Sequence, residues 1–379
     1  MEKCKLGDIC EIVSGSTPKT NVEEYWDGDI KWITPAEINE NVYVINDSVR
    51  KITKLAVEKT GLSSFPKGTV ILSSRAPIGK VAIAGCEMYC NQGFKNLICS
   101  EKIYNKYLYW FLKGNTIFLN SLGRGATFKE ISKSIVSKIE IYVPPIKEQY
   151  EVVKNLETVS RIIELRKQEL CALDTLVKAR FVEMFGSIHD GRYDMKTLPE
   201  IVNDDKNSIK RGPFGGALKK DDFVEDGYLV YEQRHAIHND FEYAKYYITQ
   251  EKYEDMIGFK VIPGDLIISC SGVTLGRIAE VPEGAKEGII NQALLKLSLN
   301  PEVMLNTFFI QQFRGEEIQE ILFGFSRGSG IPNMPSMSEV KAVKFICPPL
   351  ELQKQYCDFV NQVDKSKVIL PKSSFNVII

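Results

Sequence analysis

The residue types that most often bind metals or act as nucleophiles are sparse in this chain. Nine cysteines and three histidines occur among 379 residues, and the cysteines form no CxxC pair. Cys86, Cys90 and Cys99 make the one cysteine cluster, and no histidine lies near them in the sequence to complete a metal site. We therefore expect no metal-binding residues, and we interpret the cysteines as reduced, mostly buried thiols of a cytoplasmic protein.

The histidines lack a catalytic context, and the chain has no complete phosphate-binding loop. No HExxH motif or serine–histidine–aspartate arrangement surrounds His235 and His238, which we predict to be an exposed pair in a strand or loop. The segment APIGKV (76–81) resembles a phosphate-binding loop only superficially. Ser74 replaces a required glycine, and Val81 stands where serine or threonine should hold magnesium.

Two Pro-Pro pairs, in VPPI (143–146) and CPPL (347–350), resemble the Asn/Asp-Pro-Pro-aromatic signature of amino-methyltransferases. In both, apolar residues replace the polar first residue and the aromatic fourth residue, and no glycine-rich cofactor fingerprint accompanies them. We therefore expect no methyl-transfer site and no catalytic residues in this chain. The alternative of a nuclease or transferase with an unrecognised site would require a carboxylate or metal cluster.

Basic and hydroxyl residues gather beside glycines in the loops between predicted strands. Arg and Lys side chains can hold phosphates or the edge of guanine, and glycines let the backbone approach a duplex closely. The candidate DNA-binding residues are Thr17, Lys19, Ser74, Arg75, Lys80, Arg124, Thr127 and Lys129 in the first half, and Lys210, Arg211, Lys219, Lys220, Arg234, Arg277, Arg327 and Ser329 in the second.

These loops need a scaffold, and its centre is a long helix predicted over residues 144–186. Two prolines open the segment and Gly186 closes it, as is typical of helix ends. Its length would be roughly 60 Å at a rise of about 1.5 Å per residue. Apolar residues recur in steps of four and three, the spacing of a seam that packs on another helix. The seam positions are Val152, Leu156, Val159, Ile163, Leu170, Leu173 and Val177, with Tyr356, Val360 and Val363 on a second helix.

The chain repeats itself with a unit of about two hundred residues. The segment 65–85 predicts a pair of strands joined by a polar turn, and it recurs in the same order at 261–281. Helices are predicted at 104–119 and again around 305–319. We infer a tandem duplication of a whole domain plus a helix. The aligned positions are Gly68 and Gly264, Ser73 and Ser269, Gly79 and Gly276, Lys80 and Arg277, and the Asn-Gln pairs at 91–92 and 291–292.

The start of the chain predicts two smaller features. Residues 5–19 suggest a short amphipathic helix followed by a turn. Residues 25–34 and 42–45 suggest strands, with Asp27-Gly28 as a turn.

The composition is that of a globular protein, with 44% hydrophobic and 26% charged residues. No apolar run of eighteen or more residues is present, and the N-terminus lacks the apolar region of a secretory signal. The net charge of −1 gives no overall basic field, so any nucleic-acid contact must come from local patches.

In these motifs the chain resembles the specificity subunits (HsdS) of type I restriction–modification systems. The resemblance rests on KLGDICEIVSGSTP, on ILSSRAPIGKVAI followed by NQGFKNL, on PPIKEQ leading into a helix that ends FVEMFG, and on the second copy of each. It implies a mixed α/β (α+β) fold with two target recognition domains, at 1–143 and 187–347. It also implies spacer helices at 144–186 and 348–370 that pair as an antiparallel coiled coil.

The resemblance also implies what the chain does. A specificity subunit binds a bipartite double-stranded DNA target, one half-site per recognition domain, and is not itself catalytic. Two methyltransferase (HsdM-type) subunits dock on the helices and methylate adenine with S-adenosylmethionine, so this chain binds no cofactor. Motor-nuclease (HsdR-type) subunits complete the complex. A two-domain coiled-coil scaffold without DNA readout is the alternative.

One feature departs from the family pattern. The second helix has only about thirty residues between its Pro-Pro pair and the chain end, and Pro371 would break it. We expect this helix to be shortened, with residues 371–379 as an atypical tail. We also expect the seam around 156–163 or 170–177 to stay exposed to a partner subunit or a second copy.

Overall fold

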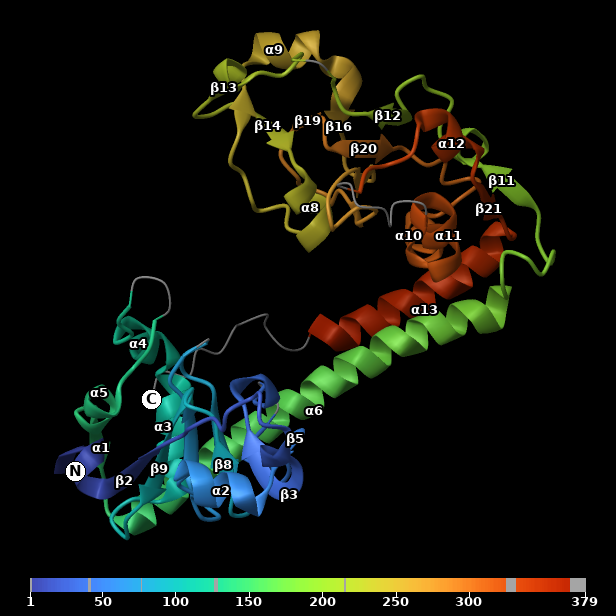
Figure 1. The fold of residues 1–379 in the computed structure, drawn as a ribbon. Helices are drawn as coiled ribbons and strands as arrows, with labels where there is room; N and C mark the ends of the chain where they lie inside the picture. Colours follow the sequence, from blue (N-terminus) through green and yellow to red (C-terminus); the bar gives the residue numbers. More distant parts are fainter. Residues whose placement is uncertain are drawn as a thin grey trace. The chain divides into compact units, whose positions relative to one another are not determined.

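In a computed structural model the chain forms two compact units that divide between Lys167 and Gln168, and each unit is described by itself (Figure 1). Among the described residues, no helix is both long and apolar enough to cross a membrane. The structure describes residues 2–39, 42–75, 77–125, 129–214, 216–324 and 332–368.

The first unit holds ten strands and five short helices within the described residues, followed by the start of a long one. The strands are β1 (Glu2–Lys5), β2 (Cys10–Ser14), β3 (Trp26–Ile33), β4 (Val44–Ile45), β5 (Arg50–Ile52), β6 (Val70–Ser73), β7 (Val81–Ala84), β8 (Tyr89–Cys90), β9 (Phe94–Cys99) and β10 (Glu140–Val143). The helices are α1 (Leu6–Ile9), α2 (Lys54–Thr60), α3 (Asn105–Gly114), α4 (Thr116–Ser121), α5 (Lys133–Ser137) and the long α6 (Ile146–Phe185).

A five-stranded sheet of order β2-β9-β6-β7-β4 forms the core of this unit. Its central strands are buried on both faces, which explains their unbroken apolar runs. Leu108 and Leu112 of α3 pack in one cluster with Val70 and Leu72, while Ile71 belongs to a cluster on the other face. Strands β5-β3-β8 form a separate sheet, and β1 pairs with β10.

Two local predictions for this unit need correction. Asp27-Gly28 is not a turn between strands, because both residues lie inside β3, where the pairing with β5 shifts register. Asp27 adopts a φ of 60°, and a side chain on Gly28 would come within 2.5 Å of the Ile52 carbonyl oxygen. The predicted opening helix covers only α1, because β2 begins at Cys10 and pairs with β9.

The second unit repeats the main sheet of the first. The strands are β11 (Met195–Thr197), β12 (Ile209–Arg211), β13 (Phe223–Val224), β14 (Tyr228–Tyr231), β15 (Tyr247–Ile248), β16 (Lys260–Val261), β17 (Leu266–Ser269), β18 (Ile278–Glu280), β19 (Gly288–Ile290), β20 (Leu294–Leu297) and β21 (Lys344–Ile346). The helices are α7 (Leu198–Ile201), α8 (Gln233–His238), α9 (Gln250–Asp255), α10 (Asn306–Arg314), α11 (Glu316–Phe323), α12 (Met337–Ala342) and α13 (Leu350–Val368). The other large sheet of this unit has five strands, in the order β13-β15-β14-β19-β16, where the first unit has three.

The duplication is visible in the strand orders. The sheet order β12-β20-β17-β18 matches β2-β9-β6-β7, and β11 pairs with β21 as β1 pairs with β10. The aligned serines confirm the register, because Ser73 Oγ accepts from the Lys80 N–H at 2.8 Å and Ser269 Oγ accepts from the Arg277 N–H at 2.9 Å. The fold-class prediction of a duplicated mixed α/β domain with long helices is therefore confirmed.

A buried glutamine in the first turn of each long helix joins that helix to the domain before it. Gln149 accepts from the Tyr104 N–H at 2.7 Å and donates to the Lys102 and Pro144 carbonyls. Gln353 likewise accepts from the Leu305 N–H at 2.9 Å and donates to two carbonyl oxygens. Each glutamine is fully buried, so its hydrogen bonds fix how the helix leaves its domain.

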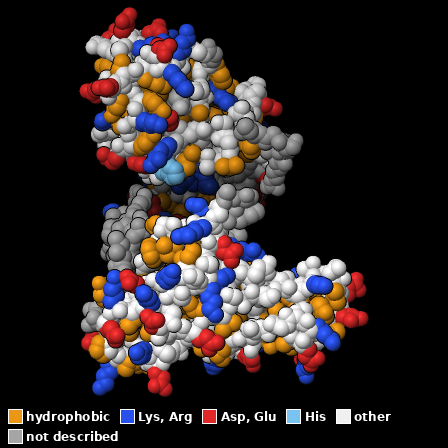
Figure 2. Space-filling view, turned by 60° about the vertical axis from the view of Figure 1, so that its left-hand side comes forward, with side chains coloured by type: hydrophobic (Ala, Val, Ile, Leu, Met, Phe, Trp, Pro, Cys, Tyr) orange, Lys and Arg blue, Asp and Glu red, His pale blue; other side chains and the backbone are white. Residues whose placement is uncertain are grey.

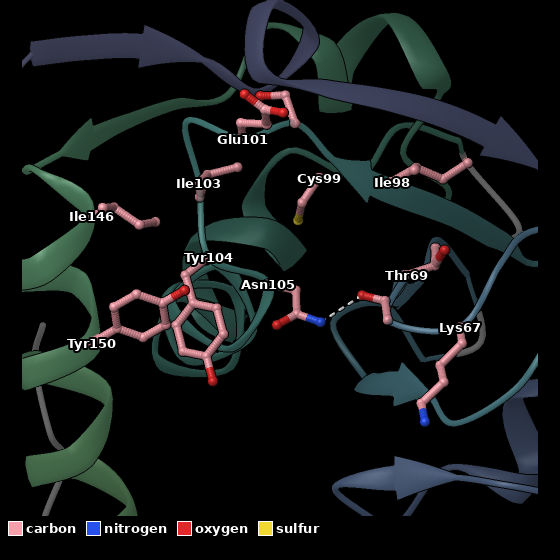
Figure 3. A pocket seen from close by; sticks show the side chains of 12 residues that line it. Lys67, Thr69, Ile98, Cys99, Glu101, Ile103, Tyr104, Asn105, Ile146 and Tyr150 are labelled. Atoms are coloured by element: carbon pink, nitrogen blue, oxygen red, sulfur yellow. Dashed lines mark hydrogen bonds between the residues drawn. The ribbon is translucent and has the colours of Figure 1, made fainter.

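An open pocket of about 340 Å³ lies beside the first of these joints (Figure 3). The rings of Tyr104 and Tyr150 form one wall, with their centroids 4.4 Å apart. Asn105 donates to the Gly68 carbonyl at 2.8 Å across its floor, and the second unit repeats this bond between Asn306 and Gly264 at 2.7 Å. The pocket thus belongs to the joint between helix and domain.

Helix α13 runs antiparallel to the C-terminal half of α6. The Tyr356 hydroxyl donates to the Val177 carbonyl at 3.1 Å, and Lys367 pairs with Asp174 at 2.8 Å. The predicted seam is confirmed here, because Val177, Tyr356, Val360 and Val363 are buried and Leu173 packs against the same cluster. Gly186 ends α6 with a φ of 72°, as predicted.

The seam prediction holds only in part elsewhere. Val153, rather than Val152, is buried in the first unit, because it shares the helix face of Gln149. The expected exposure is confirmed at Val159, which is 44% exposed, whereas Leu156 and Ile163 are half-buried. The expected exposure is wrong for the seam at 170–177, because α13 covers Leu173 and Val177. The predicted tail at 371–379 lies outside the described residues.

We predict that each buried glutamine stabilises its own unit. Gln149→Ala leaves one N–H and two carbonyl groups without their partner, so the free energy of unfolding should fall by about 1–3 kcal/mol. All three tryptophans (Trp26, Trp32 and Trp110) lie in the first unit, so tryptophan fluorescence in urea reports that unit alone.

Gln353→Ala should instead shift the unfolding followed by circular dichroism and leave the fluorescence transition unchanged. The exposed Gln355→Ala is the matched control on α13. Equal effects of Gln149→Ala and Gln355→Ala on the fluorescence transition would contradict the assignment.

Candidate nucleic-acid interface

Three loops meet at one end of the five-stranded sheet in the first unit. Ser74, at the end of β6, donates its N–H to the Gly93 carbonyl at 2.7 Å. Its own carbonyl accepts from the Ile131 N–H at 3.0 Å. We call the described residues of 74–80, 91–93 and 123–131 the first junction. Backbone hydrogen bonds join its three loops, and bonds of this kind do not depend on which side chains the loops carry.

One carboxylate of the first junction pairs with an almost buried ammonium on β9. Glu130 accepts from the Lys95 ammonium at 3.2 Å, and that ammonium also donates to the Ser74 hydroxyl at 3.2 Å. Arg75 forms an isolated β-bridge with Glu130, and Arg124 exchanges two backbone hydrogen bonds with it, both at 3.0 Å. The structure therefore brings the backbones of Ser74, Arg75 and Arg124 together beside Glu130. The sequence placed these three residues in loops but did not predict that the loops meet.

Other predicted residues lie around this junction. Thr17 donates its hydroxyl to the Gln92 side chain, and Lys80 donates its ammonium to the Pro35 carbonyl at 2.8 Å. One hydrogen-bond donor of the Lys80 ammonium is therefore already used within the fold. Lys19 and Lys129 are exposed. Thr127 lies outside the described residues.

The second unit builds the same loop frame with different side chains. Cys270 takes the place of Ser74. Its backbone N–H donates to the Ala293 carbonyl and its carbonyl accepts from the Met334 N–H, both at 2.9 Å. We call the described residues of 270–277, 291–293 and 332–334 the second junction. Asn291 accepts from the Ala293 N–H at 3.0 Å, as Asn91 accepts from the Gly93 N–H at 2.9 Å. The repeated asparagines thus hold their loops in shape.

A polar network covers the second junction. Gln233 on α8 exchanges hydrogen bonds with Ser271, accepting from its N–H at 3.2 Å and donating to its hydroxyl at 3.3 Å. Arg211 donates to the Asn333 side chain at 3.2 Å and lies 5.6 Å from the ring centroid of Phe214. The sequence identified Arg211 but missed Gln233 and Asn333. In the sequence, neither Gln233 nor Asn333 lies next to a basic residue flanked by glycine, the pattern that identified the candidates. Folding alone brings these two residues to Ser271.

The remaining predicted residues of the second half are more dispersed. Arg277 is exposed at the second junction, and Arg234 lies 4.3 Å from the Tyr243 ring centroid. Lys210 points away from Arg211, toward Phe259, because successive residues of a strand face opposite sides. In the described part of the chain, no hydrogen bond or ion pair joins Lys219 or Lys220 to the second junction. Arg327 and Ser329 lie outside the described residues.

The predicted exposed histidine pair is wrong. His235 is fully buried in α8, where its ring nitrogens contact the backbone of Glu232 and the Tyr243 carbonyl. His238 is exposed at the end of the same helix. The polar ring is satisfied inside the core, so His235 is a structural residue.

Charge on the surface is mixed. Over most of the face shown in Figure 2, Lys and Arg side chains alternate with Asp and Glu and do not form one continuous basic surface. Among the described residues, no group of three or more His, Cys, Asp and Glu could hold a metal ion.

Comparison with known families agrees with this arrangement. The family model described as the type I restriction modification DNA specificity domain matches residues 1–174 and 213–378, which is most of the chain. This chain belongs to that family. The two matched segments correspond to the two repeats.

Named relatives share parts of the chain. The MjaIX specificity subunit of a type I restriction enzyme from Methanocaldococcus jannaschii is 39% identical over 184 residues, covering 48% of this chain and 43% of that protein. The EcoprrI specificity subunit of Escherichia coli is 29% identical over 116 residues, 29% of this chain and 28% of the relative. The chain thus matches less than half the length of these relatives.

Solved structures show the same fold. A structure concerned with complex assembly and conformational transition of the type I restriction–modification system has a TM-score of 0.60 at 17% identity, covering 97% of this chain and 90% of that one. The S subunit from M. genitalium has a TM-score of 0.52 with the same identity and coverage. Family members therefore share this architecture with little sequence in common.

We predict that Glu130 stabilises the first junction through Lys95. The Lys95 side chain is only 8% exposed, so Glu130→Ala leaves a nearly buried ammonium without its carboxylate. The free energy of unfolding should fall by about 1–3 kcal/mol, measured by tryptophan fluorescence in urea.

Glu130→Gln is the informative comparison because it keeps an acceptor and loses the charge, so its effect should be smaller. If both variants unfold like the unmodified chain, the ion pair does not stabilise the junction.

Proposed function

We propose that this chain is the DNA-specificity subunit of a type I restriction–modification complex and binds a bipartite double-stranded target. The observation that carries the proposal is the pair of junctions, which have one backbone frame and different side chains. Ser74, Arg75 and Glu130 occupy the first, and Cys270, Ser271 and Asn333 occupy the second. Loops joined by matching backbone hydrogen bonds but carrying different side chains suit two readers of two different half-sites.

The chemistry of both junctions suits base edges and phosphates. An arginine can bind guanine in bidentate fashion, and glutamine or asparagine can do the same for adenine. Arg75 supplies the first kind of group, and Arg211, Gln233 and Asn333 supply both kinds. With a net charge of −1, the chain has to rely on these local contacts.

Partner subunits would supply the catalysis. We expect two methyltransferase (HsdM-type) subunits to dock on the long helices and to methylate adenine with S-adenosylmethionine, which this chain does not bind. The exposed apolar side chains of Val159, Ile162 and Leu165 on α6 support a partner surface there. Motor-nuclease (HsdR-type) subunits would add restriction.

The long helices would set the spacing of the two half-sites. Helix α6 has 40 residues, which corresponds to roughly 60 Å at about 1.5 Å per residue. One turn of duplex is about 34–36 Å, so a helix of this length suits half-sites one to two turns apart. A methylated adenine in each of two short motifs, separated by a fixed unread gap, is the expected pattern in cells carrying this chain with its methyltransferase subunit.

We predict that the two junctions act on different half-sites. Arg75→Ala should weaken binding by about 1–3 kcal/mol and relax sequence preference in one half-site, and Arg211→Ala should do so in the other. Fluorescence anisotropy with duplexes altered in one half-site at a time measures this. Arg192→Ala, an exposed arginine outside both junctions, is the control.

Two outcomes would count against the proposal. If both variants affect the same half-site, the proposal that each repeat reads a different half-site is wrong. If the chain and its variants show no sequence preference and no salt-dependent binding, a coiled-coil scaffold without DNA readout describes it better.

A further inference from the structure

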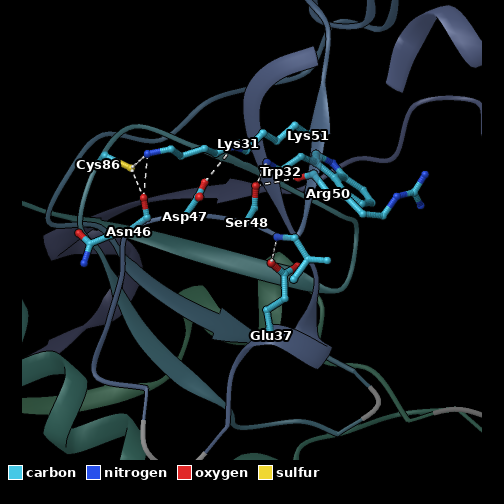
Figure 4. A network of polar contacts seen from close by, with 10 residues as sticks. Lys31, Trp32, Glu37, Asn46, Asp47, Ser48, Arg50, Lys51 and Cys86 are labelled. Carbon is cyan, nitrogen blue, oxygen red and sulfur yellow. Dashed lines mark hydrogen bonds and ion pairs between the residues drawn. The ribbon is translucent and has the colours of Figure 1, made fainter. Parts of the chain in front are cut away.

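A short loop in the first unit presents an apolar side chain to solvent. Residues 46–49 connect β4 to β5, and Val49 at the tip is 86% exposed. Single exposed apolar residues are common and need no explanation on their own. Val49 differs from such residues because a network of hydrogen bonds fixes its position (Figure 4).

One carboxylate holds the tip. Glu37 accepts from the Val49 N–H at 2.8 Å through one oxygen, and through the other it accepts from the Thr34 N–H at 2.7 Å. The second bond caps the 3-10 turn η2 (Pro35–Glu37). The position of Val49 is therefore tied to that turn.

The two sides of the loop are fixed as well. Ser48, which is 8% exposed, accepts from the Trp32 N–H at 3.0 Å and donates to the Arg50 carbonyl at 2.7 Å. The Asn46 carbonyl accepts from the Lys31 ammonium at 2.8 Å. A loop ordered in this way loses little conformational entropy when it binds a ligand.

Cationic side chains flank the exposed valine. The Arg50 guanidinium stacks on Trp26, 3.7 Å from the ring centroid, and among the described residues it makes no hydrogen bond or ion pair. Stacking uses the face of the guanidinium and leaves its N–H donors at the edge. Lys31 and Lys51 are opposite each other on β3 and β5, but Lys31 donates to the Asn46 carbonyl and Lys51 pairs with Asp47 of the loop at 3.5 Å. Arg50 is therefore the cation beside the tip that is available to a ligand. An apolar tip with a cation beside it suits a polyanion that also offers apolar groups.

The loop is connected to the first junction through η2. The Lys80 ammonium donates to the Pro35 carbonyl at 2.8 Å, and a Cβ atom on Gly93 would lie 3.2 Å from Pro35 Cγ. Pro35 begins the turn whose Glu37 holds Val49. The turn that holds Val49 therefore contacts the first junction.

We propose that Val49 is a specificity-determining residue that contacts the C5-methyl group of a thymine in the half-site bound by the first unit. This inference rests on the proposed function. The major groove displays that methyl group, and only there can an apolar side chain distinguish thymine from the other bases by contact. Arg50 binds alongside, to phosphate or guanine.

The test removes the methyl group from either side of the contact. The full chain is bound to its target duplex, and each thymine of the first half-site is replaced in turn by uracil, which lacks the methyl group. The unmodified chain should lose affinity about fourfold at one position, the effect of returning one methyl group to water. Val49→Ala should bind the original duplex about fourfold more weakly and show no further loss with uracil at that position.

Val182→Ala is the matched control, because this valine is 62% exposed but lies on α6, in the second unit. It should keep the full uracil effect. If Val49→Ala keeps that effect while sequence-specific binding persists, the inference is wrong and the proposed function stands. If the unmodified chain does not prefer its target over other duplexes, both fail. Tryptophan fluorescence verifies that the Trp26 and Trp32 environment is unchanged in Val49→Ala.

Discussion

The arrangement depends on how a rigid helix is attached to the domain that precedes it. Gln149 and Gln353 each satisfy one N–H and two carbonyl groups at that joint, entirely out of contact with water. A long helix converts a small change of direction at its base into a large displacement at its far end. Fixing the first turn with three hydrogen bonds therefore holds the direction in which each helix leaves its domain.

The two junctions show how one backbone frame can carry two different sets of side chains. Their loops are joined by backbone hydrogen bonds, which form with almost any residue, so the frame survives the change from Ser74 to Cys270. The side chains of Arg75 and Ser271 can then differ without cost to the frame. The mixed surface charge fits this division, because affinity that does not depend on sequence would need a broad basic surface.

Much of this structure could be predicted from the sequence because the signals were local or repeated. Helical spacing located α6, and the order of glycine, serine and basic residues located both strand pairs. The failures involve residues whose roles depend on distant parts of the chain. Asp27-Gly28 has the composition of a turn, but β5 pairs across it. His235 looked exposed because its backbone partners cannot be seen in the sequence, and Asn333 approaches Arg211 only after folding.

The pairing of β1 with β10, and of β11 with β21, places the entry and exit strands of each recognition domain side by side. A segment whose two ends meet can be replaced by another of different length without moving the helix that follows it. If the chain reads DNA as proposed, each domain would therefore be exchangeable as one unit. Recombination at its two ends would give a new target in a single step, whereas point substitutions would have to rebuild a reader one contact at a time.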